Sequence, residues 1–455
     1  MSHAYALPAA RVLTPVLPVV AVIALLALPV AQGGQGGQGG ATLADAASGA
    51  VVLCCAVRLL YLRRRPLSPT AAVVLGLPVV GLAVAAAGAE VPGTAVTGFA
   101  RYLQIFVVVP AAVVLLVRDR RDVRLLAWSV VGLAVWQGAI GVHQYVTGTG
   151  ASYMGREIRA VGTFGPGDIM GMATVVAFGL VCAVGLALGS APVRRGHLPA
   201  RAEPRAWERG WALVCALLLV VPLAVSFSRG AWIATALACT VQLVLAGLRR
   251  AVRVGVVVAA VAVILVGGFG VGSALLHERL GSIGQVADAP DHSVSDRYAL
   301  WAAAAGMWRE RPLTGVGLKG FPEHRDGHAT LALSSGSDTE GAGAAYRKQP
   351  LLSPHSMYLL VLGEQGLIGL LTLAGSWLAL LVLGLRRLAQ ARRARNPGLD
   401  CGLIAFGLLV WHLVNFTYAD IGGPSTVLTA VCLGLSAWWA LAGPDGTVAE
   451  EAAAR

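Results

Sequence analysis

The sequence predicts an all-α polytopic membrane protein with about twelve transmembrane helices and one large extracytoplasmic loop. Of its 455 residues, 56% are hydrophobic and only 13% are charged, and the mean hydropathy is +0.72. Apolar runs of about 20 residues, the length that crosses a bilayer as a helix, recur along the chain. Short clusters of arginine separate these runs, which is typical of a polytopic membrane protein. The composition therefore excludes a water-soluble enzyme.

Twelve candidate spans follow from the apolar runs, with ends placed to within a few residues. Their ranges are 12–31, 42–62, 70–89, 96–117, 125–146, 168–190, 211–227, 231–248, 254–276, 355–385, 400–419 and 424–442. The chain accordingly divides into spans one to nine (1–276), a large loop (277–352), spans ten to twelve (353–443) and a tail (444–455).

The arginine clusters predict the orientation. They occupy every second connector, and together with three isolated arginines they put 23 of the 35 basic residues on one side of the membrane. The positive-inside rule makes that side cytoplasmic, so both termini are expected in the cytoplasm and the large loop outside. The formal net charge of +12 is thereby explained by topology, and no nucleic-acid partner is expected.

The large loop is the segment in which chemistry is expected, because a loop of this length is too long for a simple connector. Within it, 296–309 predicts a helix ended by Pro312, with Trp301 and Trp308 on one face. Two alternatives fit this periodicity equally: a helix lying at the membrane interface, and a helix packed on the rest of the loop.

Two motifs in the loop have simple structural explanations. Gly315, Gly317 and Gly320 match a dinucleotide fingerprint, but no strand-helix-strand unit surrounds them. We expect these glycines to form a turn that returns close to the bilayer and carries Lys319 with it. His324 and His328 have metal-ligand spacing only if helical, and the nearby glycine and polar residues favour a loop, so no metal site is expected.

Arg229 and His355 are stronger candidates for a functional site. Arg229 lies in a tight turn between two apolar spans, where an arginine is costly unless it binds something; snorkelling to lipid headgroups is the alternative. His355 stands at the outer mouth of the tenth span on the same face as Tyr358, although it could also merely cap the helix. Glu364 points away from that face and is interpreted as a buried structural partner to another helix.

These motifs together resemble the O-antigen ligase and O-antigen polymerase superfamily. Four stretches of sequence show the resemblance, which is strongest over residues 150 to 370. They are Ser228-Arg-Gly230, Asp296-Arg297 with Trp301, Glu310 to Phe321, and His355-Ser with Tyr358-Leu and Gly363-Glu-Gln-Gly-Leu-Ile-Gly369. Gly162-Thr-Phe-Gly165, which follows Arg156 and Arg159, is similar to a connector of the same family but lacks the asparagine that often follows it.

The resemblance implies a fold and a function. Members of this superfamily are similar to other polyprenyl-dependent membrane glycosyltransferases, and act as inverting, metal-independent enzymes without a cofactor. They transfer a glycan from an undecaprenyl-diphosphate carrier to an acceptor hydroxyl on a glycan, lipid or protein at the outer face of the cytoplasmic membrane, in cell-surface polysaccharide assembly.

The resemblance also implies site residues. Arg229 and Arg297 would bind the diphosphate, and His355 would act on the acceptor. Lys319, Tyr358, Arg156 and Arg159 are further substrate-binding candidates.

Elementary chemistry is consistent with these roles. Guanidinium groups neutralise a departing diphosphate bidentately, and a histidine can take the proton of an attacking hydroxyl.

Alternative functions stay open at this point. Within the enzyme class they are an O-antigen or exopolysaccharide polymerase, a peptidoglycan polymerase of the shape, elongation and division type, and a protein O-glycosyltransferase. A twelve-span transporter is the alternative from another class, but the polar candidates gather at helix ends rather than at the bilayer midplane.

Overall fold

The computed structural model describes residues 15–30, 42–62, 67–153, 157–165, 168–189, 206–263, 292–329, 337–341, 347–349, 352–393 and 398–441. The helices up to α9 are α1 (Leu17–Leu25), α2 (Leu43–Leu62), α3 (Pro69–Ala87), α4 (Pro92–Leu103), the π-helical turn η1 (Gln104–Val108), α5 (Val109–Leu116), α6 (Arg120–Thr147), α7 (Gly171–Leu188), α8 (Ala206–Val225) and α9 (Arg229–Ala246). The later helices are α10 (Leu248–Val263), α12 (His292–Glu310), α13 (Phe321–His328), α14 (Met357–Arg393), α15 (Leu399–Asn415) and α16 (Thr426–Leu441). A short 3-10 helix, η2 (Gly162–Phe164), precedes α7.

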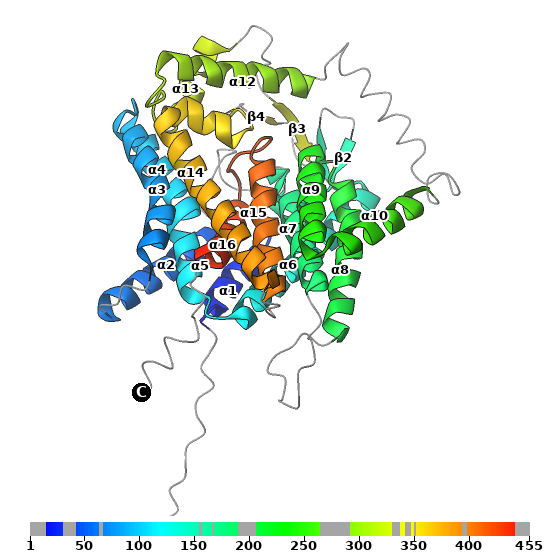
Figure 1. Cartoon of the computed structure of the whole chain (residues 1–455). Helices are drawn as coiled ribbons and strands as arrows, with labels where there is room; N and C mark the ends of the chain where they lie inside the picture. Colours follow the sequence, from blue (N-terminus) through cyan, green and yellow to red (C-terminus); the bar gives the residue numbers. More distant parts are fainter. Residues whose placement is uncertain are drawn as a thin grey trace, which may run out of the picture.

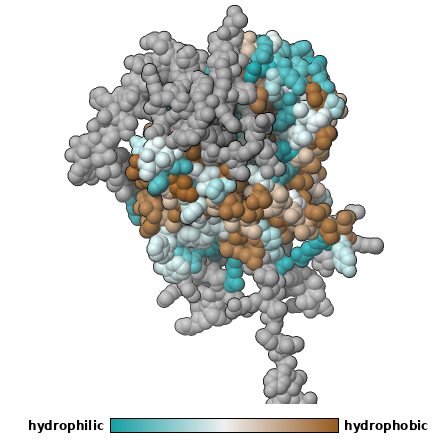
Figure 2. Space-filling model, turned by 180° about the vertical axis from the view of Figure 1, so that it is seen from behind, coloured by the Kyte–Doolittle hydropathy of each residue, from teal (hydrophilic) through white to brown (hydrophobic). Residues whose placement is uncertain are grey.

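Helices are the membrane-spanning elements, as predicted. Eight helical segments in the described residues are long and apolar enough to cross a membrane, and two shorter apolar helices, α15 and α16, accompany them. The predicted count of about twelve stays a prediction. The apolar helices pack side by side into one bundle, α10 diverges from it, and α12 lies across one end (Figure 1). Apolar side chains cover the middle of the face seen in Figure 2, where a bilayer would contact it.

The two ends of the bundle differ in chemistry. At one end, here called the His355 end, lie His355 and the starts of α9, α14 and α16. At the opposite end, called the Asp400 end, the fully buried Asp400 accepts hydrogen bonds from the side chains of Arg120 and Arg124, at 2.9 Å each. This buried ion pair ties the start of α6 to the start of α15.

A small antiparallel sheet lies at the His355 end and was not predicted. Its strands are β1 (Ala151–Tyr153), β2 (Glu157–Arg159), β3 (Ser337–Gly341) and β4 (Arg347–Gln349), in the order β2-β1-β3-β4. The pairing of β1 with β3 joins the connector that follows α6 to the large loop. The sheet therefore links two segments that the sequence analysis treated separately.

Helix α12 confirms the helix predicted at 296–309, and its packing decides between the two alternatives. Leu300, Ala303, Ala304 and Met307 are buried in a cluster with Phe321 of α13 and Leu360 of α14. The indole nitrogen of Trp301 donates to the Pro354 carbonyl at 2.9 Å. Helix α12 therefore packs on the protein, and it anchors the segment that leads into His355.

The expectation of a loop around His324 and His328 is wrong. Residues Phe321–His328 form α13, because Pro322 occupies the first turn, where it costs no hydrogen bond, and the Phe321 side chain is fully buried. The two histidines nevertheless face different carboxylates: His324 lies 3.5 Å from Glu90 and His328 lies 3.0 Å from Glu310. Within the described residues, no group of three or more His, Cys, Asp or Glu side chains could hold a metal ion.

Candidate active site at the His355 end

The glycine-rich turn at Gly315–Gly320 threads into a break in α14. At Gly366 the backbone of α14 is non-helical, with φ 63° and ψ −161°. The amides of Val316 and Gly317 donate to the carbonyls of Gly363 and Glu364, at 2.9 and 3.0 Å. A close approach of two backbones with positive φ requires glycine, which explains Gly315 and Gly366. The glycines thus form a turn that carries Lys319, as predicted, and the closeness of this turn to the bilayer stays a prediction.

Lys319, carried by this turn, lies over the ring of Tyr102, with its ammonium 5.6 Å from the ring centroid. The fully buried Glu364 accepts a hydrogen bond from the Phe321 amide at 3.3 Å, and the charge of Lys319 acts on the same carboxylate. Glu364 is thus buried as predicted, and its hydrogen bond comes from the first residue of another helix, α13, where the glycine-rich turn ends. Lys319 therefore lies near Tyr102 and Glu364.

His355 precedes α14 and adopts a left-handed backbone conformation, with φ 50°. Its surroundings come from two elements: Arg297 of α12, and Asp420 in the connector between α15 and α16. Burial lowers the pKa of the His355 imidazole below its usual 6.5; the positive charge of Arg297 also lowers it, and the negative charge of Asp420 opposes both. The charges of Arg297 and Asp420 therefore both act on His355, and the lowered pKa favours a neutral imidazole at neutral pH.

The connector Phe416–Ser425 joins the elements of the site. The amide of Met357, at the start of α14, donates to the carbonyls of Phe416 and Ala419 at 2.9 and 3.0 Å. Tyr418 packs against Gly230, where an added Cβ would lie 3.3 Å from the tyrosine Cβ. Arg229, the first residue of α9, is exposed beside this contact, so the connector approaches both Arg229 and His355.

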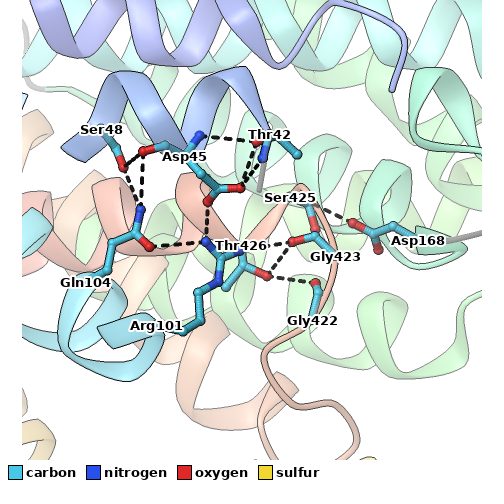
Figure 3. Close-up of polar contacts among 10 residues, drawn as sticks. All are labelled: Thr42, Asp45, Ser48, Arg101, Gln104, Asp168, Gly422, Gly423, Ser425 and Thr426. Atoms are coloured by element: carbon cyan, nitrogen blue, oxygen red, sulfur yellow. Dashed lines mark hydrogen bonds and ion pairs between the residues drawn. The ribbon is translucent and has the colours of Figure 1, made fainter. Parts of the chain in front are cut away.

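The far part of the connector is fixed by a polar cluster (Figure 3). Arg101 pairs with Asp45 and Gln104 and donates to the Gly423 carbonyl at 3.4 Å, and the Ser425 amide donates to Asp168 at 3.1 Å. Burial raises the pKa of Asp168 to about 6. Residues from α2, α4 and the start of α7 therefore hold the connector that carries Asp420.

The remaining candidates have different surroundings. The Tyr358 hydroxyl donates to the Leu413 carbonyl at 2.8 Å, a contact that anchors α14 to α15. The backbone of Arg159 pairs with Ala151 in the sheet. Arg156 lies outside the described residues, and nothing is described of the Arg159 side chain.

Asp420 is the residue that sequence reasoning missed. The negative charge of Asp420 acts on His355, on the Glu364 carboxyl and on the Tyr102 hydroxyl. The buried Oδ2 atom of Asp420 has no hydrogen bond within the described residues. A signal was present in the sequence: an acidic residue in a short connector on the same side of the membrane as His355. Asp420 can be assigned to the site only once the structure shows that this connector packs against the start of α14.

The bundle and its site define a class of protein, a polytopic membrane protein with a polar site at one end. Comparison with known proteins agrees with this class. Residues 214–374 match the family described as O-Antigen ligase, a stretch that runs from α8 into α14 and includes Arg229, Arg297, Lys319 and His355. The match confirms that this part of the chain carries the domain of the O-antigen ligase superfamily. No curated protein matches the chain.

Proposed function

We propose that this protein transfers a glycan from an undecaprenyl-diphosphate carrier to an acceptor hydroxyl at the outer face of the cytoplasmic membrane. The family match supports a membrane glycosyltransferase-like role in the assembly of cell-surface polysaccharide. The observation that carries the proposal is the action of the Arg297 and Asp420 charges on His355, beside the packing of the connector against the start of α14. These residues lie at the end of the bundle opposite the arginine clusters. That end is the expected extracytoplasmic side.

In the proposed reaction, the acceptor oxygen attacks the anomeric carbon of the glycan while the bond from that carbon to the diphosphate breaks. The diphosphate leaves with the electron pair, and Arg229 and Arg297 stabilise its growing negative charge. His355 takes the proton of the acceptor hydroxyl, for which it must be neutral beforehand. Asp420 then stabilises the imidazolium by its opposite charge. No step requires a cofactor, and we expect inversion at the anomeric carbon from this single displacement.

Replacing either arginine tests the proposal. With purified protein in vesicles and an undecaprenyl-diphosphate-linked glycan, Arg229→Ala and Arg297→Ala should each lower kcat/KM by about 10² to 10³, as expected for loss of one contact to developing charge. Arg309→Ala is a matched control, because Arg309 is exposed on the same helix as Arg297. Near-normal turnover in both arginine variants would contradict the diphosphate role.

The same assay separates a ligase from a polymerase. A polymerase uses a second carrier-linked glycan as acceptor, so it lengthens the glycan when the donor is the only substrate. A ligase needs a different acceptor and leaves the donor unchanged. We expect no product with the donor alone.

A further inference from the structure

An open groove lies between α6 and α8 at the Asp400 end, far from the proposed active site along both helices. Its volume is about 540 Å³, within the range of small-ligand sites. The lining residues are Arg124, Leu125, Trp128, Trp207, Glu208, Trp211 and Cys215. Trp207, Trp211 and Cys215 follow each other at four-residue intervals and so form one stripe along α8.

The groove opens toward the expected bilayer. Trp207 and Trp211 are 56% and 58% exposed, and the outward side chains of the next turns of α8 are apolar and exposed as well, including Leu213, Leu217 and Leu218. Exposed tryptophans at the end of a membrane helix are typical of the interface between headgroups and acyl chains. An apolar chain therefore suits the lining better than water does.

The end of the groove is cationic. Arg124 is neutralised by Asp400 and Glu208. Arg121 precedes Leu125 by one turn and Trp128 by two, so it lies on the same stripe of α6. Arg121 is exposed, and its guanidinium has no ion pair or hydrogen bond within the described part of the chain. An anionic group at the rim of the groove would complement this charge.

We propose that this groove binds one anionic phospholipid, with an acyl chain along the tryptophans and the phosphate at Arg121. The two halves of the site select this ligand together. Inorganic phosphate would not use the apolar lining, and a zwitterionic lipid, whose own ammonium offsets its phosphate, would gain less from the charge of Arg121. The inference does not depend on the proposed glycosyl transfer.

Native mass spectrometry of the detergent-purified full chain tests the proposal. We titrate dioleoyl phosphatidylglycerol, dioleoyl phosphatidylcholine and inorganic phosphate separately and measure the dissociation constant for the first bound molecule. We expect the phosphatidylglycerol to bind on the order of tenfold more tightly than the phosphatidylcholine, with the difference reduced by salt. Equal affinities of the two lipids, or binding of inorganic phosphate as tight as that of phosphatidylglycerol, would overturn the proposal.

Two pairs of variants locate the site. Trp211→Ala should weaken phosphatidylglycerol binding on the order of tenfold by removing apolar contact area, whereas Leu213→Ala, an exposed position on the opposite face of α8, should not. Arg121→Gln should abolish the preference over phosphatidylcholine, whereas Arg118→Gln, an exposed arginine that precedes α6 and so is not on its Leu125 and Trp128 stripe, should retain it. Wild-type affinity in both Trp211→Ala and Arg121→Gln would place the lipid elsewhere and contradict the proposal.

Discussion

Three residues of the described chain other than glycine have a positive φ: Phe227, Lys319 and His355. Such conformations cost about 1 to 3 kcal/mol each and persist only where the surroundings enforce them. Lys319 and His355 lie in motifs that predicted the site, and Phe227 directly precedes the motif Ser228-Arg-Gly230. The backbone strain at these positions therefore supports a functional role for each of the three segments.

The pH dependence of turnover tests the role of His355. A histidine acts as a general base only when it is neutral, so activity should rise with pH and then level off. The midpoint of this rise should lie at the pKa of His355, below 6.5. Asp420→Asn removes a charge that raises this pKa and should move the midpoint further down. Arg297→Gln removes a charge that lowers it and should move the midpoint up. Profiles of kcat/KM against pH, which report the pKa of the free enzyme, check this for the three proteins, and shifts in the same direction for both variants would contradict it.

Arg229 and His355 could be predicted as site residues from short motifs at the ends of apolar runs, and Arg297 from the resemblance to the O-antigen ligase superfamily. The sequence could not identify Asp420. Nothing in the sequence indicates that Phe416 and Ala419 accept hydrogen bonds from the start of α14, and these contacts bring Asp420 to the site.

At the scale of elements, the broken helix α14 positions the glycine-rich turn. The sequence predicted one continuous span at 355–385, since Gly366 lies within an apolar run and single glycines are tolerated in helices. The break depends on tertiary pairing: the amides of Leu367 and Ile368 donate to the carbonyls of Pro312 and Leu313, at 2.9 and 3.1 Å. Spans can thus be predicted from hydropathy, whereas such interruptions cannot.

Gly366→Ala should lower the free energy of unfolding by about 2 kcal/mol or more, because a Cβ would overlap the Leu313 carbonyl and the conformation is essentially restricted to glycine. Gly384→Ala is the matched control on the same helix, because its Cβ would make only ordinary contacts of 3.7 Å or more. Thermal unfolding of the two variants in detergent measures the difference. Equal stability would mean that the break in α14 is not required.

A second prediction about stability concerns the buried ion pair of Asp400 with Arg120 and Arg124. Asp400→Asn leaves Arg120 and Arg124 without their shared partner and should cost about 3 kcal/mol or more. Asp326→Asn disrupts a pair at an exposed carboxylate and should leave the melting temperature unchanged. A small, equal effect of both substitutions would contradict the importance of the buried pair.

At the scale of the whole molecule, the distribution of arginine predicts that the His355 end faces outward. In a cysteine-free background, cysteine at the exposed Asp326 should react with a membrane-impermeant thiol reagent in intact cells. Cysteine at the exposed Arg118 should react only after permeabilisation. The opposite pattern would reverse the topology and place the site on the cytoplasmic side.

The most direct test of the central claim is the turnover of His355→Ala, measured together with donor affinity on purified, monodisperse protein. General-base assistance is worth about 10² to 10⁴ in rate, so turnover should fall by that factor while the variant still binds the undecaprenyl-diphosphate-linked glycan. His328→Ala, which removes a histidine paired with Glu310 outside the site, should keep its activity. Unchanged turnover of His355→Ala per folded molecule would contradict the assignment of His355 to the acceptor step.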